Sequence, residues 1–517
     1  MSDLIASQPV EARPRSVDYK SAAATARLRA RYRTETWFKY SGLVAIGIAT
    51  LFLAALTINI VRSGLPAFWT HSLVVTVQTS AEDVDAADIR SFDYSKIGKG
   101  ALKVLFPDVK DRADRKSLNA LLSSGAADAV RERLVADPTL IGKALDTSLL
   151  LSADADLYLK GDGTTITIRP GTGTATPSDT SGEIAIALSN SGIVPGGVLD
   201  DKVPSLLLAL NGGIAKVTAV KSGSVTATVI SPLTSTDAAS NWRFFSYSVP
   251  ESERRLNDKQ ITWLEQLKAH GLVQTHINWL FVTSGDSREP ELAGIRGSLI
   301  GTLLTLFVTL SLCLPIGVLA AIYLEEFAPK NRLTDLIEIN INNLAAVPSI
   351  VFGLLGLAVF LNYLALPRSA PLVGGIVLSL LVLPTIIIAS RAALKSVPGS
   401  IKDAALGVGA SQQQAVFHHV LPLAMPGIMT GTIIGMARAL GETAPLLMIG
   451  MVAFVVDVPR AFMDAATVLP VQVYLWSDLP EQAFVVKTAA ASIVLLVVLF
   501  LMNGVAIVLR RRFERRW

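Results

Sequence analysis

The sequence predicts a polytopic α-helical membrane protein with six transmembrane helices and a large mixed α/β extracytoplasmic domain inserted between the first and second helices. Hydrophobic residues make up 51% of the 517 residues and charged residues only 17%, and mean hydropathy is +0.48. Six predominantly apolar stretches have about the 20 residues or more that a helix needs to cross a bilayer. The long stretch between the first two has the composition of a soluble domain.

This composition excludes several classes of protein. A single soluble globule carries about 25% charged residues, and a disordered chain or a basic nucleic-acid-binding protein would be more polar. The net charge is only +4. Cys313 is the single cysteine, which excludes an intrachain disulfide and a cysteine-rich zinc site.

The first apolar stretch, 41–61, follows the aromatic residues Trp37, Phe38 and Tyr40, which suit a membrane interface. Its length and its long basic flank favour a span over a cleaved signal peptide. The other predicted spans are 297–324, 341–364, 372–390, 427–455 and 488–509.

Lysine and arginine residues near the spans predict the orientation. With both termini inside, the inner segments 1–40, 325–340, 391–426 and 510–517 hold 18 basic residues, and the two short outer loops hold three. Positive charge accumulates in cytoplasmic loops, so we expect both termini in the cytoplasm and residues 62–290 in the periplasm of an inner-membrane protein.

The predicted domains follow from these limits. They are a basic cytoplasmic arm (1–40), a first transmembrane helix (41–61), a periplasmic mixed α/β domain (62–290), a five-helix core (291–510) that includes the loop 391–426, and a basic cytoplasmic tail (511–517).

The periplasmic segment contains 26 acidic and 23 basic residues. Alternating apolar and polar residues predict two hairpins, at 158–169 around a Gly-Asp-Gly turn and at 217–230 around Lys221–Ser224. Residues 114–123, 126–135 and 256–270 have helical patterns. We therefore expect a domain with a core of its own, stabilised by packing alone.

Two charges lie deep in an apolar stretch, Arg438 and Glu442 of the fifth predicted span. An ionised side chain there costs at least about 2.5–3.5 kcal/mol. The i, i+4 spacing places both on one helix face, where they can pair. One interpretation is a structural pair that ties this helix to a neighbour. The other is a polar path in which Arg438 donates to an anion, because a guanidinium matches two oxygens of phosphate or sulfate.

The same stretch starts with Gly427, Gly431 and Gly435, a repeated pattern of small residues that allows close helix contact. Pro445 is expected to kink this helix.

The inner loop 391–426 is predicted to form two short helices joined near Gly407 and Gly409; an ordinary connecting loop is the alternative. Asp403-Ala404-Ala405, Gly409 and Val420-Leu421-Pro422 resemble the EAA loop of ABC-importer permeases, with Asp where Glu is usual and Val where Ile is common. In that family the loop docks into a separate ATPase. The resemblance implies that Asp403, Ala404, Ala405, Gly409, Leu421 and Pro422 form the ATPase-coupling loop.

Three further segments resemble the phosphate-specific, PstA-type branch of these permeases. They are Leu314–Gly317 with Tyr323–Phe327, Val347–Leu354, and Arg438–Pro445. The resemblance covers about 291–510 and implies a permease-type core that forms half of a phosphate pathway, with Arg438, Glu442 and Thr443 along it. It also implies as partners a homologous second permease, two ATPase subunits, a periplasmic phosphate-binding protein and membrane lipid.

The sequence has no phosphate-binding G-x-x-x-x-G-K-[ST] loop, so we expect ATP and Mg²⁺ on the partner ATPase and no cofactor on this chain. We predict no catalytic residue, no metal site and no nucleic-acid partner. Alternative functions are a permease for another oxyanion such as sulfate or phosphonate, a membrane-anchored sensor or scaffold, and a secondary transporter.

Overall fold

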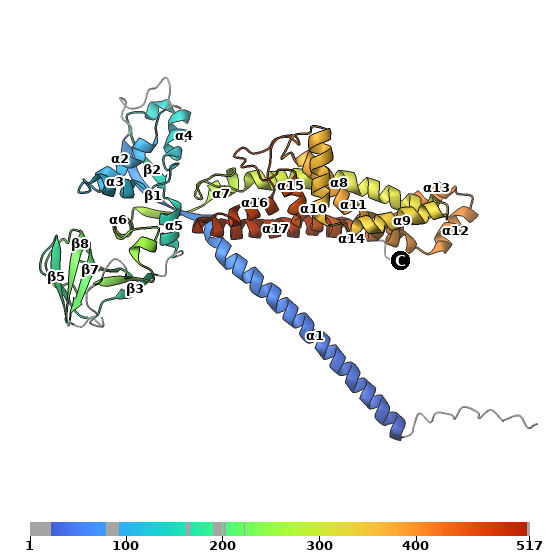
Figure 1. Ribbon diagram of the computed structural model, residues 1–517, viewed down its shortest axis with the longest axis horizontal. Coiled ribbons are helices and arrows are strands. Elements are labelled where there is room, and N and C mark those ends of the chain that lie inside the picture. Colours follow the sequence, from blue (N-terminus) through green and yellow to red (C-terminus); the bar gives the residue numbers. More distant parts are fainter. Residues whose placement is uncertain are drawn as a thin grey trace, which may run out of the picture. The chain divides into compact units, whose positions relative to one another are not determined.

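The computed structural model of the chain describes residues 22–78, 92–161, 166–189, 199, 203–221 and 223–513. It confirms the predicted fold class, with membrane-type helices and an α/β domain between the first and second of them (Figure 1). Residues 1–21 of the predicted basic arm and 514–517 of the predicted tail lie outside the described residues.

The first predicted span is part of one helix, α1 (Ala22–Gly64), which also includes the basic segment before it. Its 43 residues are about twice the roughly 20 that a bilayer crossing needs. The N-terminal extension is polar and carries an i, i+4 ion pair between Lys39 and Glu35 at 2.7 Å. The helix is therefore a membrane segment continued by a charged segment.

Five helical segments in the described part of the chain are long and apolar enough to cross a membrane. They are Thr25–Phe68, Arg296–Phe327, Pro371–Lys395, Gln412–Gly441 and Gln482–Arg512. The predicted span 341–364 is instead a broken pair, α9 (Arg332–Ala345) and the segment Ser349–Tyr363, bent by 102°. Pro348 lies at the break, because a proline disfavours helical backbone in the residue before it.

The predicted fifth span, 427–455, is wrong as a continuous helix. Helix α14 (Leu421–Gly441) ends before Glu442, whose backbone is extended. A short helix, α15 (Ala444–Met448), follows, and then irregular chain leads to α16 (Leu469–Ser477) and α17 (Gln482–Phe513). Pro445 explains the break, because its ring excludes a helical hydrogen bond to residue 441.

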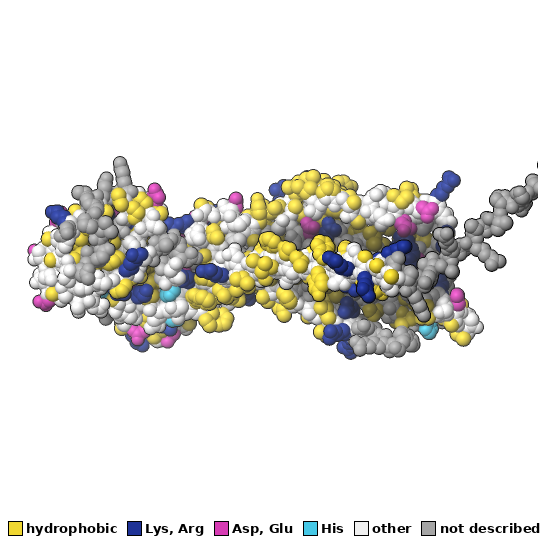
Figure 2. Space-filling view, turned by 90° about the horizontal axis from the view of Figure 1, so that it is seen from below, with side chains coloured by type: hydrophobic (Ala, Val, Ile, Leu, Met, Phe, Trp, Pro, Cys, Tyr) yellow, Lys and Arg dark blue, Asp and Glu magenta, His cyan; other side chains and the backbone are white. Residues whose placement is uncertain are grey.

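Small residues let the long helices α8 (Arg296–Ile322), α11 (Pro371–Lys395) and α14 pack closely. A Cβ built on Gly431 would lie 2.2 Å from the Cβ of Ala389, and one on Gly375 would lie 2.5 Å from Val308. The glycine pattern predicted for helix contact thus faces α11. Hydrophobic side chains gather over the membrane-type helices in Figure 2, whereas charges of both signs are spread over the strand-rich part.

The α/β domain contains two antiparallel sheets. A three-stranded sheet has the order β10-β1-β2, and a seven-stranded sheet has the order β3-β9-β6-β7-β8-β5-β4. The strands are β1 (Trp69–Gln78), β2 (Ala144–Leu150), β3 (Ile166–Pro170), β4 (Ala175–Pro177), β5 (Glu183–Leu188), β6 (Leu206–Leu210), β7 (Gly213–Lys221), β8 (Ser224–Ser231), β9 (Arg243–Tyr247) and β10 (Val273–Ile277). Helices α2 (Ser95–Leu105), α3 (Arg112–Asn119), α4 (Asp128–Ala136), α5 (Ala153–Lys160), α6 (Asp258–Ala269) and α7 (Trp279–Thr283) complete the segment.

One of the two predicted hairpins is confirmed. Strands β7 and β8 pair across the predicted turn, of which Ser222 lies outside the described residues. The hairpin at 158–169 is wrong, because Tyr158 belongs to helix α5 and β3 pairs with the distant strand β9. Gly161 caps the end of α5 with φ +76°. A glycine that is predicted for a hairpin turn can equally well end a helix, because both need this backbone conformation. Residues 162–165 of this prediction lie outside the described residues.

A buried ion pair joins the start of α6 to the seven-stranded sheet. Arg254 Nη2 lies 2.8 Å from Asp258 Oδ1, and Lys216 Nζ lies 3.1 Å from the other carboxylate oxygen. Burial alone would raise the pKa of Asp258, but hydrogen bonds and attraction from Arg254 and Lys216 outweigh it and hold the pKa below its ordinary value of 3.8. The Arg254 guanidinium also lies 4.0 Å from the Tyr247 ring centroid.

We predict that Gly431→Ala destabilises the membrane core by about 1–3 kcal/mol, because the added methyl would overlap Ala389. The apparent melting temperature of the purified protein in detergent should fall. Gly504→Ala is the matched control, since a Cβ at this membrane-helix position meets no atom within 4 Å. Equal melting temperatures for the two variants would contradict the observed α11–α14 contact.

We predict that Asp258→Asn destabilises the α/β domain by about 3–5 kcal/mol at neutral pH, because it leaves Arg254 buried without its partner. The pKa of Asp258 is lowered, so its contribution is present above about pH 4 and is lost as pH falls through the lowered pKa. Hydrogen exchange of α6 amides should be faster in the variant, with a difference that shrinks in acid. A difference independent of pH would contradict the assigned ionisation.

Candidate functional site

The charged pair predicted in the membrane lies at the interruption between α14 and α15. Arg438 is in the last turn of α14, and its Nε lies 3.4 Å from Oε1 of Glu442, the first residue past the helix. The Arg438 side chain is 45% exposed and that of Glu442 19%. A contact this long and exposed is a weak ion pair, so the guanidinium keeps donors for another partner.

Thr443 connects the charged pair to α15. It is the N-cap residue of that helix, and its carbonyl oxygen accepts a hydrogen bond from the Leu447 amide at 2.9 Å. Its side chain is half-buried. The three residues predicted for the substrate pathway, Arg438, Glu442 and Thr443, are therefore brought together by the end of one helix and the start of the next.

A second broken helix packs beside this interruption. Helix α10 (Ser349–Leu355) contacts α15, and a Cβ built on Gly353 would lie 2.7 Å from the Cα of Pro445. In membrane proteins, irregular backbone at membrane depth occurs where protein or a water-filled cavity satisfies its polar groups. The half-exposed guanidinium therefore lies next to irregular backbone at the end of α14.

The inner loop folds as two short helices, as predicted. Helix α12 (Gly399–Gly407) and helix α13 (Gln412–Ala415) are separated by Gly409, whose φ of +92° favours glycine. Asp403 and Ala404 are exposed, whereas Ala405 is buried. Leu421 and Pro422 are half-buried and begin α14, so the six predicted coupling residues divide between an exposed loop surface and the foot of a membrane helix.

The exposed part of this loop also carries apolar side chains that the sequence reasoning did not single out. Val408 is 87% exposed, and Leu406 and Phe417 are exposed as well. Their positions next to Asp403 and Gly409 could have indicated a contact surface. Exposed apolar residues gathered on one loop are typical of a surface that another protein covers.

Charged residues that the sequence reasoning also missed attach the loop to the helix core. The Glu326 carboxylate lies 2.6 Å from Lys402 Nζ of α12, and its backbone oxygen accepts a hydrogen bond from Gln412 Nε2 of α13 at 2.6 Å. The next pair, Arg391–Glu338, is 2.9 Å long and joins α11 to α9. Arg391 also lies 3.4 Å from Glu325. Glu325 and Glu326 belong to the segment Tyr323–Phe327, which resembles the PstA-type permeases, but the resemblance predicts no role for either residue.

The α/β domain is attached to α16, to the start of α17 and to the turn between them. Trp476 Nε1 of α16 donates to Asp286 at 3.0 Å, Arg255 donates to the Pro480 carbonyl at 2.9 Å, and the buried Lys487 of α17 donates to the Ala293 carbonyl. Burial raises the pKa of the Asp286 carboxyl and of the Glu291 carboxyl. These contacts fix the domain to the core at several points.

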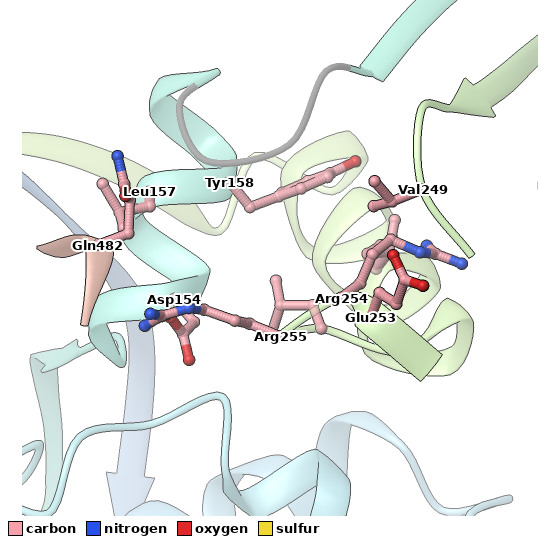
Figure 3. A pocket seen from close by; sticks show the side chains of 10 residues that line it. Asp154, Leu157, Tyr158, Val249, Glu253, Arg254, Arg255 and Gln482 are labelled. Carbon is pink, nitrogen blue, oxygen red and sulfur yellow. The ribbon is translucent and has the colours of Figure 1, made fainter. Parts of the chain in front are cut away.

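A cavity of about 170 Å³ lies at this attachment (Figure 3). Arg255 extends toward Asp154 of α5, at 3.3 Å, and Gln482 of α17 lies beside them. The cavity is lined by both charged and apolar side chains of the domain. Among the described residues, no group of three or more His, Cys, Asp or Glu side chains is placed to hold a metal ion.

Comparison with known families matches two parts of the chain. Residues 296–517 match the family described as binding-protein-dependent transport system inner membrane component, and residues 25–167 match a domain of unknown function, DUF3333.

Three curated relatives are similar to part of the chain. The chain is 30% identical over 238 residues to the phosphate transport system permease protein PstA 1 of Mycobacterium tuberculosis. This match covers 46% of this chain and 77% of the relative. It is 34% identical over 174 residues to the probable ABC transporter permease protein YqgI of Bacillus subtilis, covering 34% of this chain and 58% of the relative. It is 34% identical over 199 residues to the phosphate transport system permease protein PstC 2 of M. tuberculosis, and this match covers 34% of this chain and 61% of the relative.

Among solved structures, the chain is similar to one of the MetNI methionine ABC transporter in an inward-facing conformation. The TM-score is 0.34 with 18% identity, and the match covers 46% of this chain and 97% of the other.

Proposed function

This chain belongs to the PstA-type family of phosphate ABC transporter permeases, and we propose that it forms half of a phosphate pathway whose anion-binding group is Arg438. The observation that carries the proposal is the half-exposed guanidinium at the interruption between α14 and α15. The coarser function, a multi-pass permease subunit of an ABC importer in the inner membrane, follows from the family.

The proposed chemistry uses the geometry of the pair. Arg438 offers N–H donors that match two oxygens of a tetrahedral anion. Glu442, at 3.4 Å, keeps the guanidinium oriented and partly neutralised while no anion is bound. An entering phosphate would compete with that carboxylate for the same donors, and the weak pair can open at small cost.

The proposed partners follow from the family and from the loop surface. The relatives carry the names PstA and PstC, so we propose a second, homologous permease as the other half of the pathway. The exposed residues Asp403, Leu406 and Val408 suit docking of one ATPase of a pair. A periplasmic phosphate-binding protein would deliver the anion, with the termini in the cytoplasm and 62–290 outside. ATP and Mg²⁺ would bind the ATPases rather than this chain.

We propose that ion pairs and hydrogen bonds carry movement of the docked loop into the core. Glu326 holds α12 through Lys402 and α13 through Gln412, and Arg391 joins α11 to α9. Helix α10 follows α9 in the bent helix pair, and it packs on α15, which begins two residues after Glu442. We propose that these contacts pass loop displacement to the two interruptions, which is how ATP-driven closure would change access to Arg438.

We predict that Arg438→Ala lowers phosphate uptake by the assembled complex about 10- to 100-fold, the range that losing a charge-assisted hydrogen bond of about 1.5–3 kcal/mol produces. Arg438→Lys should recover part of the uptake, because it keeps the charge but loses the two-pronged geometry. Radiolabelled phosphate uptake into vesicles measures the effect, with sulfate and phosphonate as competitors to test the anion class. Arg332→Ala, which removes an exposed arginine of α9, is the control. Normal uptake by both Arg438→Ala and Glu442→Gln would refute the pathway.

We predict that Glu326→Lys and Lys402→Glu each uncouple the transporter, with fewer phosphates moved per ATP hydrolysed, and that the double variant recovers much of the loss. The expected coupling energy is about 1 kcal/mol, roughly fivefold in rate. Reversal of the Lys259–Asp114 pair, 2.7 Å long in the α/β domain, is the matched control and should leave the ratio unchanged. If the double variant is no better than the singles, the contact does not carry the coupling.

A further inference from the structure

The first helix shows where the outer surface of the membrane meets the chain. The exposed aromatic residues Trp37, Phe38 and Tyr40 lie where the charged segment of this helix gives way to its apolar segment. The 25 residues from Tyr40 to the end of the helix at Gly64 are separated by 24 rises of 1.5 Å and so span about 36 Å. That length matches a hydrocarbon core of about 30 Å with part of the headgroup layer. The outer headgroup layer therefore begins near Gly64.

A contact between Gly64 and α17 places the outer headgroup layer at the same residues, independently of the length of α1. A Cβ built on Gly64 would lie 2.7 Å from the backbone of Ala489 and Ala490, so this residue packs on the outer part of α17. Ala67 and Phe281 share a buried cluster with Ala490. Residues close to Ala67 and Phe281 are thereby held beside the end of a membrane helix.

Two segments more than 200 residues apart are tied together at this level. Trp69 at the start of β1 lies directly opposite Ile277 at the end of β10. Asn278 is buried, donates from Nδ2 to the Ala67 carbonyl at 3.0 Å, and donates from its amide to the Phe68 carbonyl at 2.8 Å. Trp279 is the next residue and starts α7. These contacts keep Ile277 and Trp279 close to the point where the chain leaves the membrane.

We call Leu65, Trp69, Ile277 and Trp279 the exit patch. All four side chains are exposed, Ile277 and Trp279 each at 65%. Directly opposite residues of an antiparallel pair point to the same face, so Trp69 and Ile277 form one apolar surface. A contiguous group of large exposed apolar side chains marks a surface that is covered by something other than water. Tryptophan in particular concentrates at membrane interfaces, where its ring is apolar and its N–H reaches water.

We propose that the exit patch lies in the headgroup layer of the outer leaflet and holds the base of the α/β domain on the lipid surface. Lipid is the occupant that fits because the patch lies at the level of the membrane helix ends and borders the exit of the first span. The domain is then an element that rests on the bilayer beside the pathway. This inference needs only a chain that spans the membrane, so it stands or falls separately from phosphate transport.

The test uses spin labels on the full chain in the assembled complex, reconstituted into vesicles of phosphatidylethanolamine and phosphatidylglycerol. Cys313 is buried and is replaced by alanine, and single cysteines are introduced as Ile277→Cys, Trp279→Cys and Val104→Cys. Val104 is the matched control, an apolar residue of α2 that is 80% exposed but distant in sequence from the membrane exit. Collisions of each label with oxygen, which concentrates in lipid, are compared with collisions with a water-soluble nickel chelate.

We expect the labels at 277 and 279 to collide mainly with oxygen and the label at 104 mainly with nickel. Nickel access at 277 and 279 equal to that at 104 would overturn the proposal in favour of an exposed surface. Shielding from both reagents would overturn it in favour of a contact with the partner permease.

A second measurement covers the case in which a cysteine variant fails to assemble. Phospholipids brominated close to the headgroup should quench the tryptophan fluorescence of the wild-type complex more than that of Trp69→Phe/Trp279→Phe. Equal fractional quenching of the two proteins would also overturn the proposal.

Discussion

Lipid offers no hydrogen-bond partner, so every backbone polar group of a membrane segment must be satisfied within the protein, and a helix that stops inside the core needs neighbours that tolerate its open end. Helix α14 stops at Gly441, and Glu442, Thr443 and Pro445 follow in non-helical or newly started backbone. The broken segment around Pro348 supplies the neighbour, with α10 against α15. The charged pair stands at the end of α14, just before the α15 segment on which α10 packs, and glycine contacts hold α14 against α11.

The two ends of this core are attached by different interactions. At the loop 391–426, partly exposed ion pairs centred on Glu326 and Arg391 join short helices to long ones. Such pairs are individually weak and reversible, which suits an element that moves. On the opposite side, Lys487, Trp476 and Phe281 are buried in a packed cluster with the base of the α/β domain. Burial of that extent suits a fixed attachment, so α16 and α17 would carry the domain with them.

The α/β domain has its own stabilising core. The ion pair of Arg254 and Asp258 is almost fully buried, and Lys216 of β7 joins Asp258 to the seven-stranded sheet. Two hydrophobic clusters form the core of the domain, and one of them contains residues of both sheets. No disulfide contributes, since Cys313 lies in a membrane helix. The domain therefore depends on packing and on a buried charge cluster.

Hydrophobic run length and residue spacing predicted the fold class, the short helices of the inner loop and the contact between Arg438 and Glu442, because these depend on local composition and on short sequence separations. The sequence did not predict where helices stop within a largely apolar run: residues 427–455 carry only two charges, yet the helix that contains Arg438 ends at Gly441, before Pro445. It also could not show that Glu326 meets Lys402, that Tyr158 is helical, or that Trp69 faces Ile277. Those facts depend on which distant segments pack together, and side-chain contacts across long sequence separations are decided by tertiary packing, to which local periodicity is blind.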